Sequence, residues 1–318
     1  MTRKTLTLLI ISFFSTNCAL AQKQVGIAAV NIEAEKNINI QRIENIAFNL
    51  LNASSNDSVF YYNNILKSTL KNELNKEEAL IHSFKGIESI SVISPQDSSF
   101  LLFNWNIPLN DGSFKFECGI LNRESKSEEY FSFLKDTTYQ NRIIEEHKTT
   151  LANYWIPCLF YKIIETETQF QNYYTLLFWD GNNRLTNKKG IDVLWFDKSN
   201  SARFGAPIFS FNSKKAKSRI VFEYGGQNRM KLQYNERLNR IEFDHLSPPP
   251  ADEQNTTSLE GVYEYYGPDL SFDGFVWNKK TWVYYADIDL EKGIKKKAKD
   301  FVLDEDVKQE EIPMYKPN

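Results

Sequence analysis

Residues 100–120, FLLFNWNIPLNDGSFKFECGI, decide the fold because they join two apolar strands through a strong turn. Phe100 to Trp105 is a strand-like apolar run, and in the turn at 110–112 an Asp-Gly pair readily accepts positive φ. After the turn every second residue is apolar, so these residues share one face of the next strand. They are Phe114, Phe116, Cys118 and Ile120. The stretch predicts a β-hairpin whose apolar face, Cys118 included, lies toward a core.

Alternating apolar patterns continue on both sides of this hairpin. We expect further strands at 87–93, 130–133, 155–164, 173–179, 191–196, 206–211, 219–224, 230–234, 240–243, 262–266, 272–277 and 281–285. Short turns join them and no regular helices intervene, which favours antiparallel pairing. The pattern predicts an α+β, mainly β fold in which N-terminal helices pack on a large antiparallel sheet, as a sandwich or a barrel-like meander.

The region before the strands, 38–84, has helical periodicity instead. Apolar residues recur there at spacings of three and four, as in Ile43, Ala47 and Leu50. A polar break at 52–56 separates two helices, and Asp57 or Ser58 is the expected cap of the second. We expect both apolar faces to pack on the rest of the protein.

Residues 1–21 have the three parts of a secretion signal. Arg3 and Lys4 precede the apolar run Leu6 to Phe14, and the small residues Ala19 and Ala21 suit cleavage after Ala21. The run is too short for a membrane span, which needs about 20 apolar residues. We therefore expect an exported protein without a transmembrane anchor.

Cys18 offers a second interpretation, in which a processed cysteine carries lipid. The preceding residues Ser15-Thr16-Asn17 fit that processing poorly, because it requires a large aliphatic residue followed by small ones. Cleavage after Ala21 is favoured over lipoprotein anchoring through Cys18.

The charge balance excludes one class of partner. Residues 1–21 hold two of the 38 basic residues and none of the 41 acidic ones, so their removal leaves a formal net charge of −5. Nucleic-acid binding needs a basic surplus that releases counterions, and we expect none here. The mean hydropathy of −0.47 is typical of a soluble protein.

Four segments follow from these patterns. They are a signal peptide at 1–21, a helical segment at 22–85, an antiparallel β domain at 86–290 and a charged, flexible tail at 291–318. The proline-rich interruption that begins at Ser247 is short and is followed at once by strands, so it is interpreted as a loop within the β domain.

Two cysteines remain after signal removal, Cys118 and Cys158. In an oxidising compartment they can form a disulfide, and the alternative is two buried thiols that pack as small hydrophobes. Both stay open, because sequence does not show whether their Cβ atoms approach each other. The three histidines stand far apart without paired spacing, so no metal site and no cofactor is predicted.

Several short blocks between Ile87 and Leu290 occur in a recognisable order. They are Phe103–Trp105 with Asp111–Phe114, Trp179–Asn182, Ile191–Asp197, Phe243–Leu246, Tyr266–Asp269 and Phe272–Gly274. Together they resemble a group of uncharacterised secreted proteins of Bacteroidetes-type bacteria. The group carries no known activity, so the resemblance implies an envelope location and no catalytic residue. We see no C-terminal sorting domain of the kind common in such bacteria. We therefore expect the protein to stay in the periplasm rather than to be released into the medium.

The loop after the expected strand 173–179 is rich in oxygen ligands. Trp179, Asp180 and Asn182 are binding candidates there, and the oxygen-bearing side chains of Asp180 and Asn182 suit calcium. The spaced acids and closing Glu of an EF-hand are absent, and Asp and Asn also favour turns through their own backbone bonds. The turn interpretation is preferred.

His245 follows Asp244 at a strand end. Adjacent strand residues point to opposite faces, so these two are not expected to pair. No Gly-x-Ser-x-Gly elbow completes a serine hydrolase, and a structural hydrogen bond is the preferred role of His245.

Asp269 and Asp273 are the remaining candidates. Paired carboxylates can hydrolyse glycosides if they face each other at a defined separation, but both also lie where turns favour Asp. The tryptophans suggest a sugar-stacking row, although aromatic residues in strands are usually core. The row would comprise Trp179, Trp195, Trp277 and Trp282.

No residue is assigned as catalytic from these patterns. The leading hypothesis is an exported envelope protein with a non-catalytic binding or structural role, whose partner is another envelope protein or a glycan. The alternatives are a hydrolase acting on an envelope or polysaccharide substrate and a carbohydrate-binding module.

Overall fold

The computed structural model describes residues 40–110, 112–127, 129–135, 145–211, 215–250 and 258–293. The expected signal peptide and Cys18 lie outside this set, as does most of the expected tail. The chain divides into two compact units, Met1–Ser89 and Ile90–Asn318, and each is considered by itself.

The first unit is helical. Its described part contains helical residues 40–51, α2 (Asn56–Leu74) and the short 3-10 helix η1 (Glu77–Ile81). Ser55 caps α2: its backbone is extended and its hydroxyl accepts from the Ser58 amide, while the Ser58 hydroxyl bonds back to the Ser55 backbone. The predicted cap at Asp57 or Ser58 was therefore wrong, because Ser58 is the third helical residue of a capping box that starts at Ser55.

The described part of the second unit forms three open sheets. Sheet A has the order β1 (Ser91–Ile93), β2 (Phe100–Pro108), β3 (Phe114–Asn122), β4 (Phe131–Phe133). Sheet B has the order β5 (Thr150–Leu151), β9 (Ala202–Phe204), β8 (Thr186–Phe196), β7 (Asn172–Asp180), β6 (Leu159–Glu167), and β11 (Ile220–Gly225) pairs with β8. Sheet C has the order β10 (Phe209–Ser210), β15 (Trp282–Tyr285), β14 (Gly267–Trp277), β13 (Arg240–Ser247), β12 (Leu232–Asn235).

The predicted hairpin is β2 and β3, paired antiparallel from Phe100↔Asn122 to Pro108↔Phe114. Gly112 in its turn has a φ of +83°, which a residue with a side chain adopts only at a cost. Among the described strands only β10 and β15 pair in parallel. The α+β, mainly β prediction is confirmed, and because the sheets are open the sandwich alternative is the one that holds.

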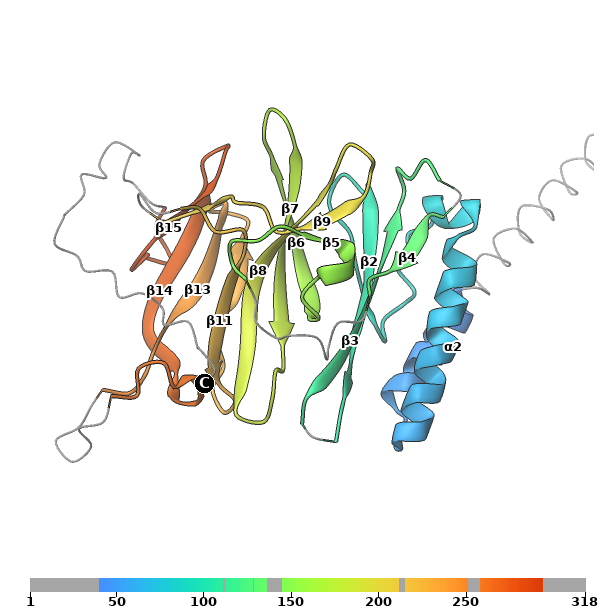
Figure 1. The fold of residues 1–318 in the computed structure, drawn as a ribbon, viewed down its shortest axis with the longest axis horizontal. Coiled ribbons are helices and arrows are strands. Elements are labelled where there is room, and N and C mark those ends of the chain that lie inside the picture. The colour runs from blue at the N-terminus through green and yellow to red at the C-terminus, as the bar shows by residue number, and fades with distance from the viewer. Residues whose placement is uncertain are drawn as a thin grey trace, which may run out of the picture. The chain divides into compact units, whose positions relative to one another are not determined.

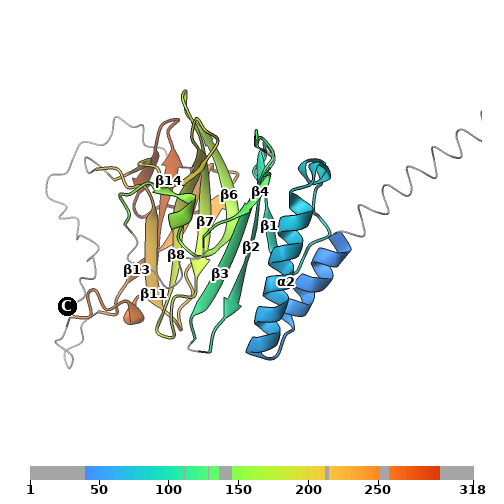
Figure 2. The same ribbon diagram turned by 45° about the vertical axis from the view of Figure 1, so that its right-hand side comes forward.

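Sheet B is the middle layer of three, as Figures 1 and 2 show. Along β7, Leu176 and Phe178 point into the apolar cluster shared with sheet A, while Leu177 between them points into the cluster shared with sheet C. A strand covered on both faces is apolar at consecutive positions instead of alternate ones. Two cores therefore sandwich sheet B.

The structure differs from the predicted strands at two places where pairing with distant residues decides the secondary structure. The segment 262–266, expected to be a strand, contains the 3-10 helix η3 (Tyr263–Tyr265). Asp269 and Asp273, expected in turns, lie within β14, which continues through a register irregularity opposite β13. No helix among the described residues is long and apolar enough to cross a membrane.

Candidate functional site

The candidate site begins with an irregularity between β13 and β14. The residue before His245 pairs with Phe272 and the residue after it pairs with Pro268, so one residue of β13 stands opposite 269–271 of β14. Leu270, at the centre of that segment, has a φ of +75° and is 89% exposed. Bulky residues rarely adopt this left-handed conformation, and bulges of this kind re-aim neighbouring side chains. Here the irregularity brings Asp269 beside His245.

His245 lies between two carboxylates. Its Nδ1 is 2.9 Å from Oδ2 of Asp273, and its Nε2 is 3.9 Å from Oδ2 of Asp269. The His245 side chain is 47% exposed, whereas that of Asp273 is 6% exposed. The histidine therefore connects a nearly buried carboxylate to a partly solvated one.

Asp273 is the centre of the site because it joins His245 to two further parts of the chain. Tyr284 on β15 donates its hydroxyl to Oδ2 at 2.8 Å, and the backbone amide of Asp287 donates to Oδ1 at 3.0 Å. Asp273 and Tyr284 share a sheet face, since Phe275, two residues after Asp273, pairs with Tyr284. Both oxygens of this carboxylate are thus committed to donors of the protein itself.

The surroundings of the site shift the pKa values of His245, Asp269 and Tyr284. The hydrogen bond that the His245 ring donates to Asp273 raises the pKa of His245; partial burial opposes this, and the charges of Asp273 and Asp269 reinforce it. Partial burial raises the pKa of Asp269, but hydrogen bonds from Ser271 and Ser247 and the charge of His245 outweigh it, so the pKa lies below its ordinary value. Burial raises the pKa of Tyr284, and Asp273 adds to the rise.

This arrangement is suited to an ion pair. A glycosidase acid needs a raised pKa and an open gap across which the second carboxylate acts. The pKa of Asp269 is lowered, whereas a glycosidase acid needs a raised one. His245 contacts both carboxylates, so the gap between them is not open. The site therefore favours a protonated histidine held by two anions.

Three of the six predicted binding candidates, His245, Asp269 and Asp273, meet at this site. As expected, His245 does not pair with Asp244, which accepts from the Lys231 amide at 2.5 Å. Its partner comes from the neighbouring strand, 28 residues further along the chain. The sequence contained both residues but not the register that joins them.

The other three candidates lie elsewhere, at the end of β7. Asp180 Oδ1 accepts from the Asn182 amide at 2.7 Å, and the Asn182 side chain donates to Thr186 Oγ1 and Glu223 Oε1. Asn182 is 4% exposed. The geometry is that of a turn closed by its own side chains, as the preferred interpretation stated. Among the described residues no three His, Cys, Asp or Glu side chains gather as a metal site.

The tryptophans do not form an open row. All six lie in the described part of the chain, three of them buried and three half-buried. Trp282 donates its indole N–H to Thr175 Oγ1 at 3.0 Å between sheets C and B, and Trp179 packs edge-on against Phe114. These rings serve packing between layers.

Cys118 on β3 and Cys158 before β6 are free thiols in this structure, both fully buried in the core between sheets A and B. Burial raises the pKa of each thiol. The disulfide stays one of the two alternatives that the sequence left open.

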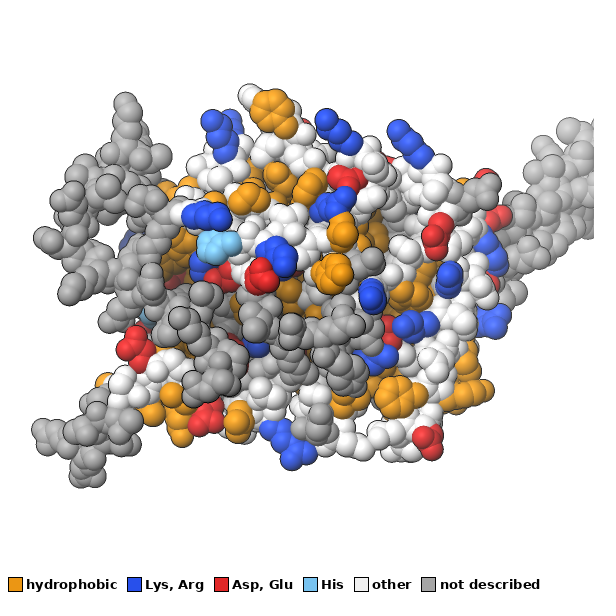
Figure 3. All heavy atoms as spheres, viewed as in Figure 1, with side chains coloured by type: hydrophobic (Ala, Val, Ile, Leu, Met, Phe, Trp, Pro, Cys, Tyr) orange, Lys and Arg blue, Asp and Glu red, His pale blue; other side chains and the backbone are white. Residues whose placement is uncertain are grey.

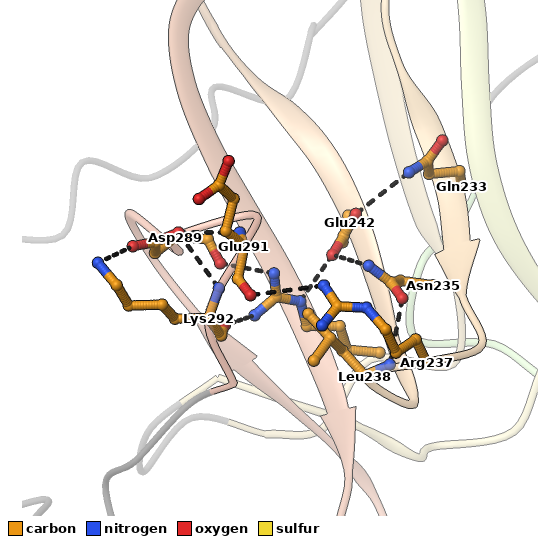
Figure 4. Close-up of polar contacts among 9 residues, drawn as sticks. Gln233, Asn235, Arg237, Leu238, Glu242, Asp289, Glu291 and Lys292 are labelled. Carbon is orange, nitrogen blue, oxygen red and sulfur yellow. Dashed lines mark hydrogen bonds and ion pairs between the residues drawn. The ribbon is translucent and has the colours of Figure 1, made fainter.

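A buried polar network adjoins the candidate site and was missed by the sequence analysis. Arg240, 1% exposed, donates to Glu242 Oε1 at 2.8 Å, to the Asp289 carbonyl at 2.6 Å and to the Lys292 carbonyl at 2.8 Å. Asn235 and Gln233 donate to the two oxygens of Glu242 (Figure 4). The alternation of polar and apolar residues in β12 and β13 was the available signal. It indicated a solvated face, on which the segment 287–293 in fact covers Arg240.

Comparison with known proteins adds no assignment. No protein-family model matches the chain, and no curated protein or solved structure matches it.

Proposed function

We propose that this chain is an exported protein of the cell envelope with a non-catalytic binding or structural role. The carrying observation is that His245 lies between Asp269 and Asp273, while each carboxylate also accepts donors from its own surroundings. Ionisable residues whose charged groups are bound to one another in this way support a structural role at the protein surface. The secretion-signal pattern at 1–21 and the resemblance to secreted proteins support the location.

The surface chemistry supports a protein or glycan partner. On the face in Figure 3, Lys and Arg side chains are interspersed with Asp and Glu, and the hydrophobic side chains lie in separate areas. Mixed charge of this kind lacks the single-sign surface that nucleic acids require. Leu270 adds one protruding apolar side chain beside the ionisable cluster.

The decisive experiment compares binding with turnover. A tagged full-length chain is expressed in its host, the cells are fractionated, and the periplasmic protein is tested against peptidoglycan and envelope polysaccharides for retention and for released products. We expect periplasmic recovery and no product formation. Product formation that Asp269→Asn abolishes would establish the hydrolase alternative, and recovery in the cytoplasm would refute the proposed location.

The matched control for that assay is Asp180→Asn. Asp180 belongs to the turn after β7 and does not belong to the His245 cluster. A loss of product formation in both variants would indicate damaged folding, whereas a loss only in Asp269→Asn would assign catalysis to the cluster. A chain that binds neither polymer but captures an envelope protein after cross-linking fits the proposal.

A further inference from the structure

The segment that follows β15 crosses the outer face of sheet C. Ile288 is 8% exposed, its amide donates to the Phe272 carbonyl at 2.7 Å, and its side chain lies over Gly274. Further along, Arg240 donates to the carbonyls of Asp289 and Lys292. We call residues 287–293 the strap.

The beginning of the strap is held by Asp273. The Asp287 amide donates to Oδ1 of that carboxylate at a point where the backbone turns with a φ of 49°. The other oxygen, Oδ2, contacts His245 Nδ1 and the Tyr284 hydroxyl. One nearly buried carboxylate therefore joins the strap to a histidine that remains accessible to solvent.

We propose that His245 is a pH-responsive clasp, whose protonation holds the beginning of the strap on sheet C and whose deprotonation loosens it. The protonated ring neutralises Asp273 and separates it from the like charge of Asp269. Once the ring is neutral, the nearly buried charge of Asp273 has lost its counter-charge, although the Tyr284 hydroxyl and the Asp287 amide still donate to it. The folded arrangement that holds the strap therefore loses stability.

The charges that face His245 all favour this direction. Asp269 and Asp273 approach it from β14, and the hydroxyl of Tyr284 on β15 bonds the same carboxylate. On its own strand, Asp244 bonds the backbone amide of Lys231. The far end of the strap is held by Arg240, which donates to the carbonyls of Asp289 and Lys292. The contact that His245 controls is the one at the beginning of the strap, between Asp273 and the Asp287 amide.

The sign follows from the raised pKa of His245. A histidine whose pKa is higher in the folded than in the unfolded protein contributes stability that is complete below about pH 6.5. That contribution disappears as the pH rises through the folded-state pKa. The strap is therefore expected to be tighter in mildly acidic medium and looser in alkaline medium.

The test measures hydrogen exchange of the Asp287 and Ile288 amides as protection factors, which correct for the intrinsic pH dependence of exchange. In the full chain at pH 5.5, we expect the protection factors of these amides to be about two- to fivefold higher in the wild type than in His245→Gln. This range corresponds to a solvent-accessible ion pair. The ratio is expected to approach one at pH 9. A ratio that is the same at both pH values would refute the clasp.

Two further variants separate the clasp from general effects. His147→Gln removes an exposed histidine whose Nδ1 lies 3.3 Å from the Ala216 carbonyl, and it should match the wild type at every pH. Ile288→Ala removes the apolar anchor of the strap and should lower protection equally at pH 5.5 and pH 9. A pH-dependent effect of Ile288→Ala would contradict the assignment to His245.

A second measurement holds even if His245→Gln does not fold. The His245 ring is titrated by NMR in the wild-type protein, together with the protection of the two strap amides. Both transitions should share one midpoint above pH 6.5. The proposal would be refuted by a ring midpoint at or below that of an unperturbed histidine. It would also be refuted if the protection of the strap amides did not change with pH in parallel with the ring titration.

Discussion

Two buried ion pairs of the second unit have similar chemistry and opposite surroundings. Arg240 and Glu242 are each 1% exposed, and both oxygens of Glu242 accept hydrogen bonds. The three nitrogens of Arg240 all donate, two of them to strap carbonyls. This pair is fully satisfied, and it fastens one segment of the chain to another.

Asp192 and Arg219, between β8 and β11, form the contrasting pair. Asp192 is completely buried, and its Oδ1 accepts from Arg219 Nε at 3.3 Å and from the Val193 amide at 2.8 Å. Its Oδ2 has no hydrogen-bond partner among the described residues. The comparison teaches that burial of an ion pair is stabilising only when neighbouring donors complete it.

The ionisation of the two acids reflects this difference. Burial raises the pKa of Glu242, but hydrogen bonds from Arg240, Asn235 and Gln233 outweigh it, and the pKa lies below the ordinary value. Burial also raises the pKa of Asp192, and there the charge of Arg219 does not compensate.

The largest effect should come from Arg240→Met. Removing one partner of a buried ion pair leaves the other charge uncompensated, so we expect a loss of about 3–5 kcal/mol in the free energy of unfolding. Urea denaturation measures this loss, and amide protection of 289–292 should fall with it. A loss below about 1 kcal/mol would mean that Glu242 is solvated or neutral. Arg237→Met is the control, because Arg237 is exposed and its hydrogen bond to the Glu291 carbonyl is long, at 3.4 Å.

A smaller effect is expected for Gln233→Leu, which gives Glu242 the defect that Asp192 has naturally. The substitution removes the 3.1 Å bond to Oε2 and leaves a buried charged oxygen without that donor. We expect a loss of about 1–3 kcal/mol in urea unfolding. An unchanged midpoint would show that the contrast between the pairs does not arise from completed hydrogen bonding.

The smallest effect is a difference in pH dependence. Since the folded-state pKa of Glu242 is lowered, its stabilising contribution is present above pH 4.5 and is lost as the pH falls through the folded value. Since the folded-state pKa of Asp192 is raised, its ionisation costs stability as the pH rises from 3.8 through the folded value. The cost of Glu242→Gln should shrink on acidification from pH 7 to pH 4, while the cost of Asp192→Asn should grow. Thermal denaturation of both variants checks this, and parallel curves would contradict it.

The candidate site shows how far sequence reasoning extended. His245, Asp269 and Asp273 were all singled out from the residues, yet the predicted roles placed both acids in turns. Their meeting requires that β13 and β14 pair in one register and that the register shifts at a single residue. Such pairing is set by side chains far along the chain, and a shift of one residue would move His245 to the other face.

The amino-acid sequence by itself determined the local elements. Helical spacing marked 40–51 and α2, the Asp-Gly turn marked the β2–β3 hairpin, and period-two patterns marked most strands of the β region. Short-range sterics and the apolar face of each segment are sufficient for such features.

Only the tertiary structure decided what covers each face. It buried both sides of sheet B, placed the strap over Arg240 of β13, and brought His245 to Asp273. The physical reason is that a pattern of polar and apolar residues specifies which face a side chain is on. It does not specify which distant segment will lie against that face, because the whole chain competes for that position.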